Sequence, residues 1–138
     1  MCIRDSLEGV QTRYENADEQ LDRIAALPKE TATRTMQQIY KEPVKPELVG
    51  KRVKEIKDGG VLAAASLTPQ RVEEHFQAAL DAGLDVLIIQ GTVVSAEHVS
   101  SRVEPLDLRK FIESCPVPVI VGGVASYATT LHLMRTGH

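Results

Sequence analysis

The sequence predicts an α/β fold in which parallel strands alternate with helices. Three short apolar runs carry this prediction, at 61–66, 85–90 and 117–122, and amphipathic segments separate them. The last two runs are continuously apolar and rich in β-branched residues, which is typical of strands that are covered on both faces, as in parallel sheets. The predicted order from residue 61 is therefore strand–helix three times, with right-handed crossovers.

Upstream of these strands the sequence mainly predicts helices. Leu7 to Gln11 is the candidate end of an earlier strand. Asn16 and Glu19 have the spacing of a capping box, and they precede a helix that ends at Pro28. Two further helices are predicted over 30–40 and 46–58.

Capping residues place the helices that connect the strands. Thr68 is a candidate N-cap with Pro69 as the first helical residue, and Gly83 is a natural stop for that helix. The remaining segments are predicted as a polar loop at 93–104, a short helix at 106–114 and a final helix from Ser126 to Gly137.

The composition excludes several classes of function. The chain has 138 residues, 43% of them hydrophobic and 25% charged, with a net charge of -3. This acidic balance and an aromatic content of 4% argue against a nucleic-acid partner. No apolar run is long enough for a transmembrane helix, so no membrane partner is expected. Two cysteines cannot build a disulfide framework, and we predict a cytoplasmic protein.

Both ends of the chain are expected to be artificial. Residues 1–6 form a patternless start that resembles one recurring on unrelated metagenomic sequences, so we interpret 1–6 as a non-native scar and 7–138 as native. The strands are too few to close a barrel. The strand residues expected to be poorly covered are Ile88, Ile89, Val119 and Val121. The isolated chain is therefore expected to aggregate or to stay partly unfolded.

Ligands of parallel βα folds bind at the carboxyl ends of the strands, and small or polar residues follow each apolar run here. Glycine lets backbone amides approach a phosphate or a ring closely. The alternative explanation is that strand ends simply need turn residues. The three clusters are Ser66-Leu67-Thr68, Gln90-Gly91-Thr92 and Gly122-Gly123.

Other reactive side chains are weaker candidates. Cys115 precedes its strand and should lie on the stabilising, amino-terminal side of the sheet. His75 and His132 are on predicted helices, where a solvated or packed imidazole is usual, whereas His98 follows a strand-end cluster and is better placed. The sequence has no Walker loop, His/Cys pair or metal-ligand spacing, so no metal site is predicted.

Several segments together resemble the IMP dehydrogenase / GMP reductase family, and most of all the IMP dehydrogenase-related proteins that lack the regulatory CBS pair. The most distinctive string is Thr92 to Val99, directly after the strand Asp85 to Gly91. The likeness covers nearly the whole chain after residue 6. Its other segments are Leu7 to Asn16, Glu104 to Leu108, Val117 to Gly123 and Thr130 to Gly137.

The resemblance implies a (β/α)8 TIM barrel, of which this chain would be a partial barrel that is incomplete at both ends. It implies oxidation of IMP to XMP with NAD in GMP biosynthesis, through a covalent intermediate on a cysteine thiolate. The family's cysteine loop follows the next strand, so no catalytic residue transfers to this chain, which alone should be inactive. The resemblance also implies a homo-oligomer, usually a tetramer, and allows a potassium ion in the intact protein.

The family's fourth strand faces the dinucleotide and typically ends Asp-Ser-Ser. The substitution by glutamine in this chain removes a carboxylate that would accept hydrogen bonds from ribose hydroxyls. The family's fifth strand typically ends Gly-Gly-Asn, and this chain has valine, Val124, in place of the amide. The predicted cofactor-binding residues are Gln90, Gly91 and Thr92, and the predicted edge of the substrate pocket is Ser66, Gly122 and Gly123.

Three alternatives stay open. GMP reductase shares the barrel and runs related purine chemistry with NADPH. The strand end at Gln90 and Gly91 also resembles FMN-dependent nitronate monooxygenases, although Thr92 to Ser95 does not match the string that usually follows there. The departures at Gln90 and Val124 also allow a catalytically empty barrel relative that acts as a binding module.

Overall fold

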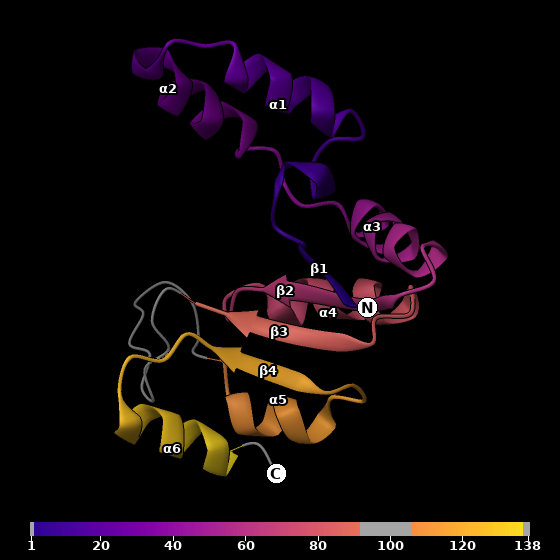
Figure 1. Ribbon diagram of the computed structural model, residues 1–138, viewed down its shortest axis with the longest axis vertical. Helices are drawn as coiled ribbons and strands as arrows, with labels where there is room; N and C mark the ends of the chain where they lie inside the picture. Colours follow the sequence, from indigo (N-terminus) through magenta and orange to yellow (C-terminus); the bar gives the residue numbers. More distant parts are fainter. Residues whose placement is uncertain (1, 92–105, 137–138) are drawn as a thin grey trace.

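The computed structural model describes residues 2–91 and 106–136, which form one parallel sheet and the helices that connect its strands (Figure 1). All neighbouring strands are parallel, and their order in the sheet is their order in the chain. A doubly wound sheet would instead reverse its strand order part of the way along the chain. The strands are β1 (Cys2–Ser6), β2 (Leu62–Leu67), β3 (Val86–Gln90) and β4 (Val119–Gly122).

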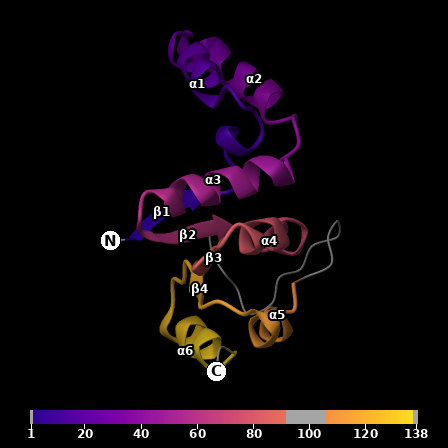
Figure 2. The ribbon, with the colours of Figure 1, turned by 90° about the vertical axis from the view of Figure 1, so that its right-hand side faces the viewer.

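Two groups of helices can be distinguished in Figures 1 and 2. One pair stands beyond α3, away from the sheet, and the other helices lie beside the strands that they connect. Within the described residues, no helix is long and apolar enough to cross a membrane. The helices are η1 (Val10–Thr12, a 3-10 turn), α1 (Ala17–Ala25), α2 (Lys29–Ile39), α3 (Pro46–Asp58), α4 (Val72–Asp81), α5 (Leu108–Ser114) and α6 (Tyr127–Thr136).

The main core lies between one face of the sheet and the connecting helices. Odd-numbered strand residues point to this face, since side chains alternate along a strand. Leu67, Leu87 and Ile89 are almost fully buried there, against Val49 of α3 and Val72 of α4. The prediction that Ile89 would be poorly covered is therefore wrong. Val119 and Val121 are half-buried against the same cluster.

The opposite face of the sheet is more open toward β4. Ile88 and Ile120 are paired on this face, and Ile120 is 56% exposed, while Ile88 is half-buried. Ala64 and Ser66 on the same face of β2 are buried. Uncovered apolar surface therefore exists on the face that carries Ile88, which the sequence singled out, but the most exposed residue there is Ile120, which it did not. Aggregation of the isolated chain stays a prediction.

Residues 2–6 take part in the sheet, although the sequence interpretation set them aside. The backbone of Cys2–Ser6 pairs in parallel with Leu62–Ser66 as strand β1. The strand expected at Leu7 to Gln11 is accordingly misplaced, because Val10–Thr12 forms a 3-10 turn instead. The edge of β2 offers a row of unpaired backbone N–H and C=O groups. Residues 2–6 can pair with these groups even though their own sequence shows no strand pattern. The non-native origin of residues 1–6 stays a prediction.

Several helix ends follow the capping residues. Gly83, after α4, has a φ of 94°, a left-handed conformation that glycine adopts without a steric cost. Ser126 accepts a hydrogen bond from the Thr129 N–H at 3.2 Å, as expected of a cap ahead of α6. Thr68 is not the N-cap of α4, which begins at Val72 after Arg71. A turn at Thr68 delays the helix, since the Arg71 N–H donates to the Thr68 carbonyl.

Arg13 attaches the α1–α2 pair to the loop after β1. Its Nε and Nη2 donate to the Glu8 carbonyl at 3.4 and 3.3 Å. Its Nη1 donates to the carbonyls of Tyr40 and Glu42, which follow α2. The guanidinium also lies 5.0 Å from the centre of the Tyr40 ring, within cation–π range. The Arg13 side chain therefore links the segment after α2 to the loop after β1, and so holds the helical pair to the part of the chain that carries the sheet.

Candidate functional site

The strand pairing brings most of the predicted site residues to one edge of the sheet. Gln90 pairs with Gly122 at the carboxyl ends of β3 and β4. Beyond the strands, the Gly91 N–H donates to the Gly122 carbonyl at 2.9 Å, and the Gly123 N–H donates to the Gly91 carbonyl at 3.2 Å. These four residues thus form one continuous edge, in which every backbone position is fixed by the sheet.

The other predicted residues are placed differently. Ser66 pairs with Ile88, two residues before the level of Gln90, and is only 4% exposed. Its hydroxyl is therefore beneath the edge rather than open at it. Thr92 and His98 lie outside the described residues.

The β3–β4 part of the edge is open. A Cβ added to Gly122 or Gly123 would meet no atom of the described residues within 4 Å, and Gln90 is exposed. Among the described residues at the ends of these two strands, none carries a carboxylate. Such an edge suits close approach by a ring or a phosphate and hydrogen bonding to an amide.

Glu8 is a carboxylate at this edge that the sequence interpretation missed. The Thr68 hydroxyl donates to its Oε1 at 2.9 Å, and the Thr68 N–H donates to its Oε2 at 3.1 Å. Glu8 therefore ties the loop after β1 to the loop after β2. The available signal was an acidic residue directly after a strand, which was hidden because the strand was expected at Leu7 to Gln11.

At the opposite, amino-terminal edge of the sheet, Asp85 binds groups from α3 and β2. Lys57 Nζ donates to its two carboxylate oxygens at 3.0 and 2.9 Å, and the Ala63 N–H donates to Oδ2 at 2.7 Å. The Lys57 hydrogen bond, followed by that of Ala63, holds the pKa of Asp85 below its ordinary value. Because ligands bind at the other end of parallel strands, we interpret this carboxylate as structural.

Two of the remaining candidate side chains, Cys115 and His132, lie in ordinary surroundings. Cys115 precedes β4 at the amino-terminal edge, and its Sγ is 3.3 Å from the Val117 carbonyl oxygen. Its predicted place away from the strand-end edge is confirmed. His132 is exposed on α6. Within residues 2–91 and 106–136, no three His, Cys, Asp or Glu side chains form a group able to hold a metal ion.

His75 is the deeply buried histidine among those that the structure describes. It is 1% exposed on α4, and neither ring nitrogen has a hydrogen-bond partner within the described residues. Burial lowers its pKa below the ordinary value, against the raising influence of the Glu74 carboxylate, 3.7 Å from Nε2. Arg71 on the same helix and Arg13 also lower this pKa, and Glu8 raises it. His75 is therefore packed as a neutral ring.

This burial predicts a pH dependence of stability. The pKa of His75 is lower in the folded state than in the unfolded state, so stability is complete above the unfolded value of about 6.5 and falls as the pH drops below it. The slope contributed by one such group is at most about 1.4 kcal/mol per pH unit. Melting the full-length polypeptide at several pH values, with His75→Leu as the comparison, measures it. Equal pH dependence in both proteins would contradict the assignment.

The chain is similar to known proteins over most of its length, although no protein-family model matches it. An uncharacterized oxidoreductase of Mycolicibacterium smegmatis is 42% identical over 135 residues, 94% of this chain and 36% of that protein. An uncharacterized oxidoreductase of Mycobacterium tuberculosis is 44% identical over 118 residues, 85% of this chain and 32% of that protein. The chain thus spans about a third of the length of these curated relatives.

A similar fold is found in a crystal structure of an IMP dehydrogenase/GMP reductase-like protein from Corynebacterium glutamicum. The two chains superpose with a TM-score of 0.87 at 40% sequence identity. The match covers 97% of this chain and 36% of the Corynebacterium protein. The parallel α/β arrangement described above is therefore shared, over nearly all of this chain, with a protein of that description.

Proposed function

We propose that this chain contributes consecutive strands of the N-terminal to central part of a (β/α)8 barrel in an oxidoreductase that converts IMP to XMP with NAD. The observation that carries the proposal is the likeness to the IMP dehydrogenase/GMP reductase-like protein over 97% of the chain. The strand order supports it, because each new strand adds on the same side of the sheet, as in a barrel. The oxidoreductase names of the mycobacterial relatives agree with this class of reaction.

The strand-end edge would bind and orient rather than perform chemistry. Gly122 and Gly123 leave room for a planar ring to lie against the backbone, and Gln90 carries an amide able to exchange hydrogen bonds with it. NAD, when bound, would accept the hydride. Glu8 and Thr68 would fix the shape of the neighbouring loops through their two hydrogen bonds. The proposal further includes a cytoplasmic homo-oligomer, such as a tetramer, and a potassium ion outside this chain.

A GMP reductase-like activity is the second candidate, and one observation favours it. The ends of β3 and β4 offer no carboxylate among the described residues, and an acidic residue is what usually selects the ribose hydroxyl of NAD over the phosphate of NADP. A site of this kind is compatible with NADPH. The flavin-dependent and catalytically empty alternatives have no such observation in their favour.

The test is a turnover assay on the full-length polypeptide that carries these residues. With saturating IMP and NAD, we expect XMP and NADH to form in equal amounts, and no NADH without IMP. A parallel reaction with GMP and NADPH tests the GMP reductase-like activity, which would form IMP and ammonia. Failure of both reactions would contradict a purine oxidoreductase, and a yellow protein that releases FMN would point to the flavin alternative.

A further inference from the structure

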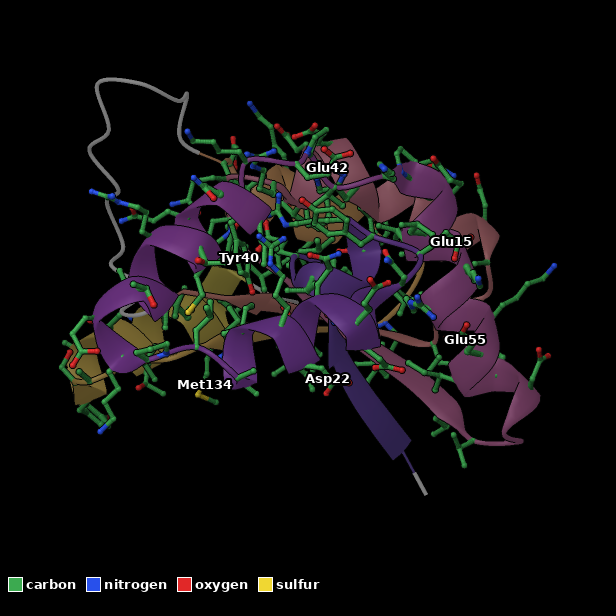
Figure 3. The ribbon with its side chains drawn as sticks, turned by 90° about the horizontal axis from the view of Figure 1, so that it is seen from above. Glu15, Asp22, Tyr40, Glu42, Glu55 and Met134 are labelled. Carbon is green, nitrogen blue, oxygen red and sulfur yellow. The ribbon has the colours of Figure 1, made fainter. Side chains whose placement is uncertain are left out.

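A cavity of about 240 Å³ lies between the helices of the α1–α2 pair. Figure 3 shows these two helices from above. It takes lining residues from both helices and from the segment before α1, and none from a strand. The α1–α2 pair also stands beyond α3, away from the sheet (Figure 1). The cavity is therefore separate from the strand-end edge. Its lining residues are Tyr14, Gln20, Arg23, Thr35, Gln38 and Ile39.

One wall of the cavity is apolar and fixed in place. Ile39 is 4% exposed and packs in a small cluster with Val10 and Ala17, against which Tyr14 also rests. The Tyr14 hydroxyl donates to the Ile39 carbonyl at 3.2 Å, which holds the two lining residues together. This second cluster is distinct from the core beneath the sheet. This wall of the open cavity is thus part of a packed unit.

The other wall is polar and carries one positive charge. Arg23 is the single ionised side chain among the lining residues, and no carboxylate lies within ion-pair distance of it in the described part of the chain. The nearby acid Glu19 instead accepts a hydrogen bond from Asn16 at 2.5 Å, and Asp22 (labelled in Figure 3) does not line the cavity. The polar wall therefore presents donors without a competing anion.

We infer that this cavity binds a small organic oxyanion, a carboxylate or a phosphate monoester with an apolar part. Arg23 supplies the planar guanidinium fork that matches such oxyanions, and charge-assisted hydrogen bonds of this kind are the strong ones. The amides of Gln20 and Gln38 and the hydroxyl of Thr35 are further donors, while the apolar part rests against Tyr14 and Ile39. Pockets for drug-sized ligands have volumes of about 300–1,000 Å³, so a smaller molecule is expected here.

The test measures binding to the full-length polypeptide by calorimetry, with benzoate, phenyl phosphate and neutral benzamide as probes. We expect at least one of the two anions to bind, benzamide not to bind, and Arg23→Gln to weaken anion binding by at least about tenfold. Arg34→Gln is the matched control, since Arg34 is an exposed arginine on α2 that does not line the cavity. Thr35→Val is a second variant, and it should weaken binding by a smaller factor.

Each other outcome overturns the inference. Absence of binding by both anions excludes the site, equal binding of benzamide excludes the role of charge, and unchanged binding in Arg23→Gln places the anion elsewhere. Because no turnover is measured, the result does not depend on the proposed purine chemistry. A substitution at the strand-end edge, such as Gly122→Ala, should leave this binding unchanged.

Discussion

Replacing Leu87 by alanine is expected to lower the free energy of unfolding by about 2–5 kcal/mol. Leu87 is fully buried at the centre of the sheet, where it pairs with Ala65 on one side and Val119 on the other. It belongs to the cluster in which strand residues meet α3 and α4. Truncation would remove apolar contacts and leave a cavity that two hydrogen-bonded neighbouring strands cannot easily collapse to fill.

The measurement is the urea midpoint of the full-length polypeptide, with Leu21→Ala as the control. Leu21 is a leucine of α1 that is 49% exposed, and its truncation should change stability by no more than about 0.5 kcal/mol. Equal losses in the two variants would show that Leu87 is not in the main core.

Substituting Arg13 by glutamine is expected to cost about 2–4 kcal/mol and to loosen the α1–α2 pair selectively. The guanidinium bonds to the carbonyls of Glu8, Tyr40 and Glu42 and lies over the Tyr40 ring. Glutamine cannot span these acceptors, and the half-buried carbonyls of Glu8 and Glu42 would lose a charged donor. The main core should persist, because Arg13 makes no contact of this kind within it.

Limited proteolysis of the full-length polypeptide reports this local loosening. Cleavage within α1 and α2 should become faster in Arg13→Gln, while sites in the sheet-bearing part stay protected. Arg34→Gln, an exposed arginine substitution on α2 itself, should behave as the wild type. Uniformly faster cleavage over the whole chain would mean that Arg13 supports the global fold and not the attachment of the helical pair.

The sequence predicted those features of the fold that depend on residues close together in the chain. The continuous β-branched runs placed β3 and β4, and the glycine at Gly83 ended α4, because strand burial and left-handed turns leave clear local signals. β1 was misplaced, since its pairing depends on a partner strand that lies far along the chain. The expectation that Ile89 would be poorly covered was also wrong, because a continuous apolar run does not show which face of the strand the helices cover.

The position of the candidate site could be predicted from the sequence, but the full set of residues that form it could not. Parallel topology alone puts the strand ends on one edge, so Gln90 and Gly122 were expected together and are paired. The contribution of Glu8 could not be foreseen, because its partner Thr68 is brought near only by the pairing of β1 with β2. The cavity at Arg23 likewise arises from the packing of two helices, which leaves no motif in the sequence.

In the proposed function, the open edge at β3 and β4 binds a nucleotide. The most direct test compares the affinities of the full-length polypeptide and its Gly122→Ala variant for IMP and for NAD. Among the described residues, the added Cβ meets no atom within 4 Å, and Gly122 does not have a positive φ, so the melting temperature should not change. We predict that the affinity for at least one of the two nucleotides falls by about tenfold or more, because the methyl group occupies the ligand's space. Unchanged affinities in a variant of unchanged stability, or a wild-type protein that binds neither nucleotide, would contradict the account.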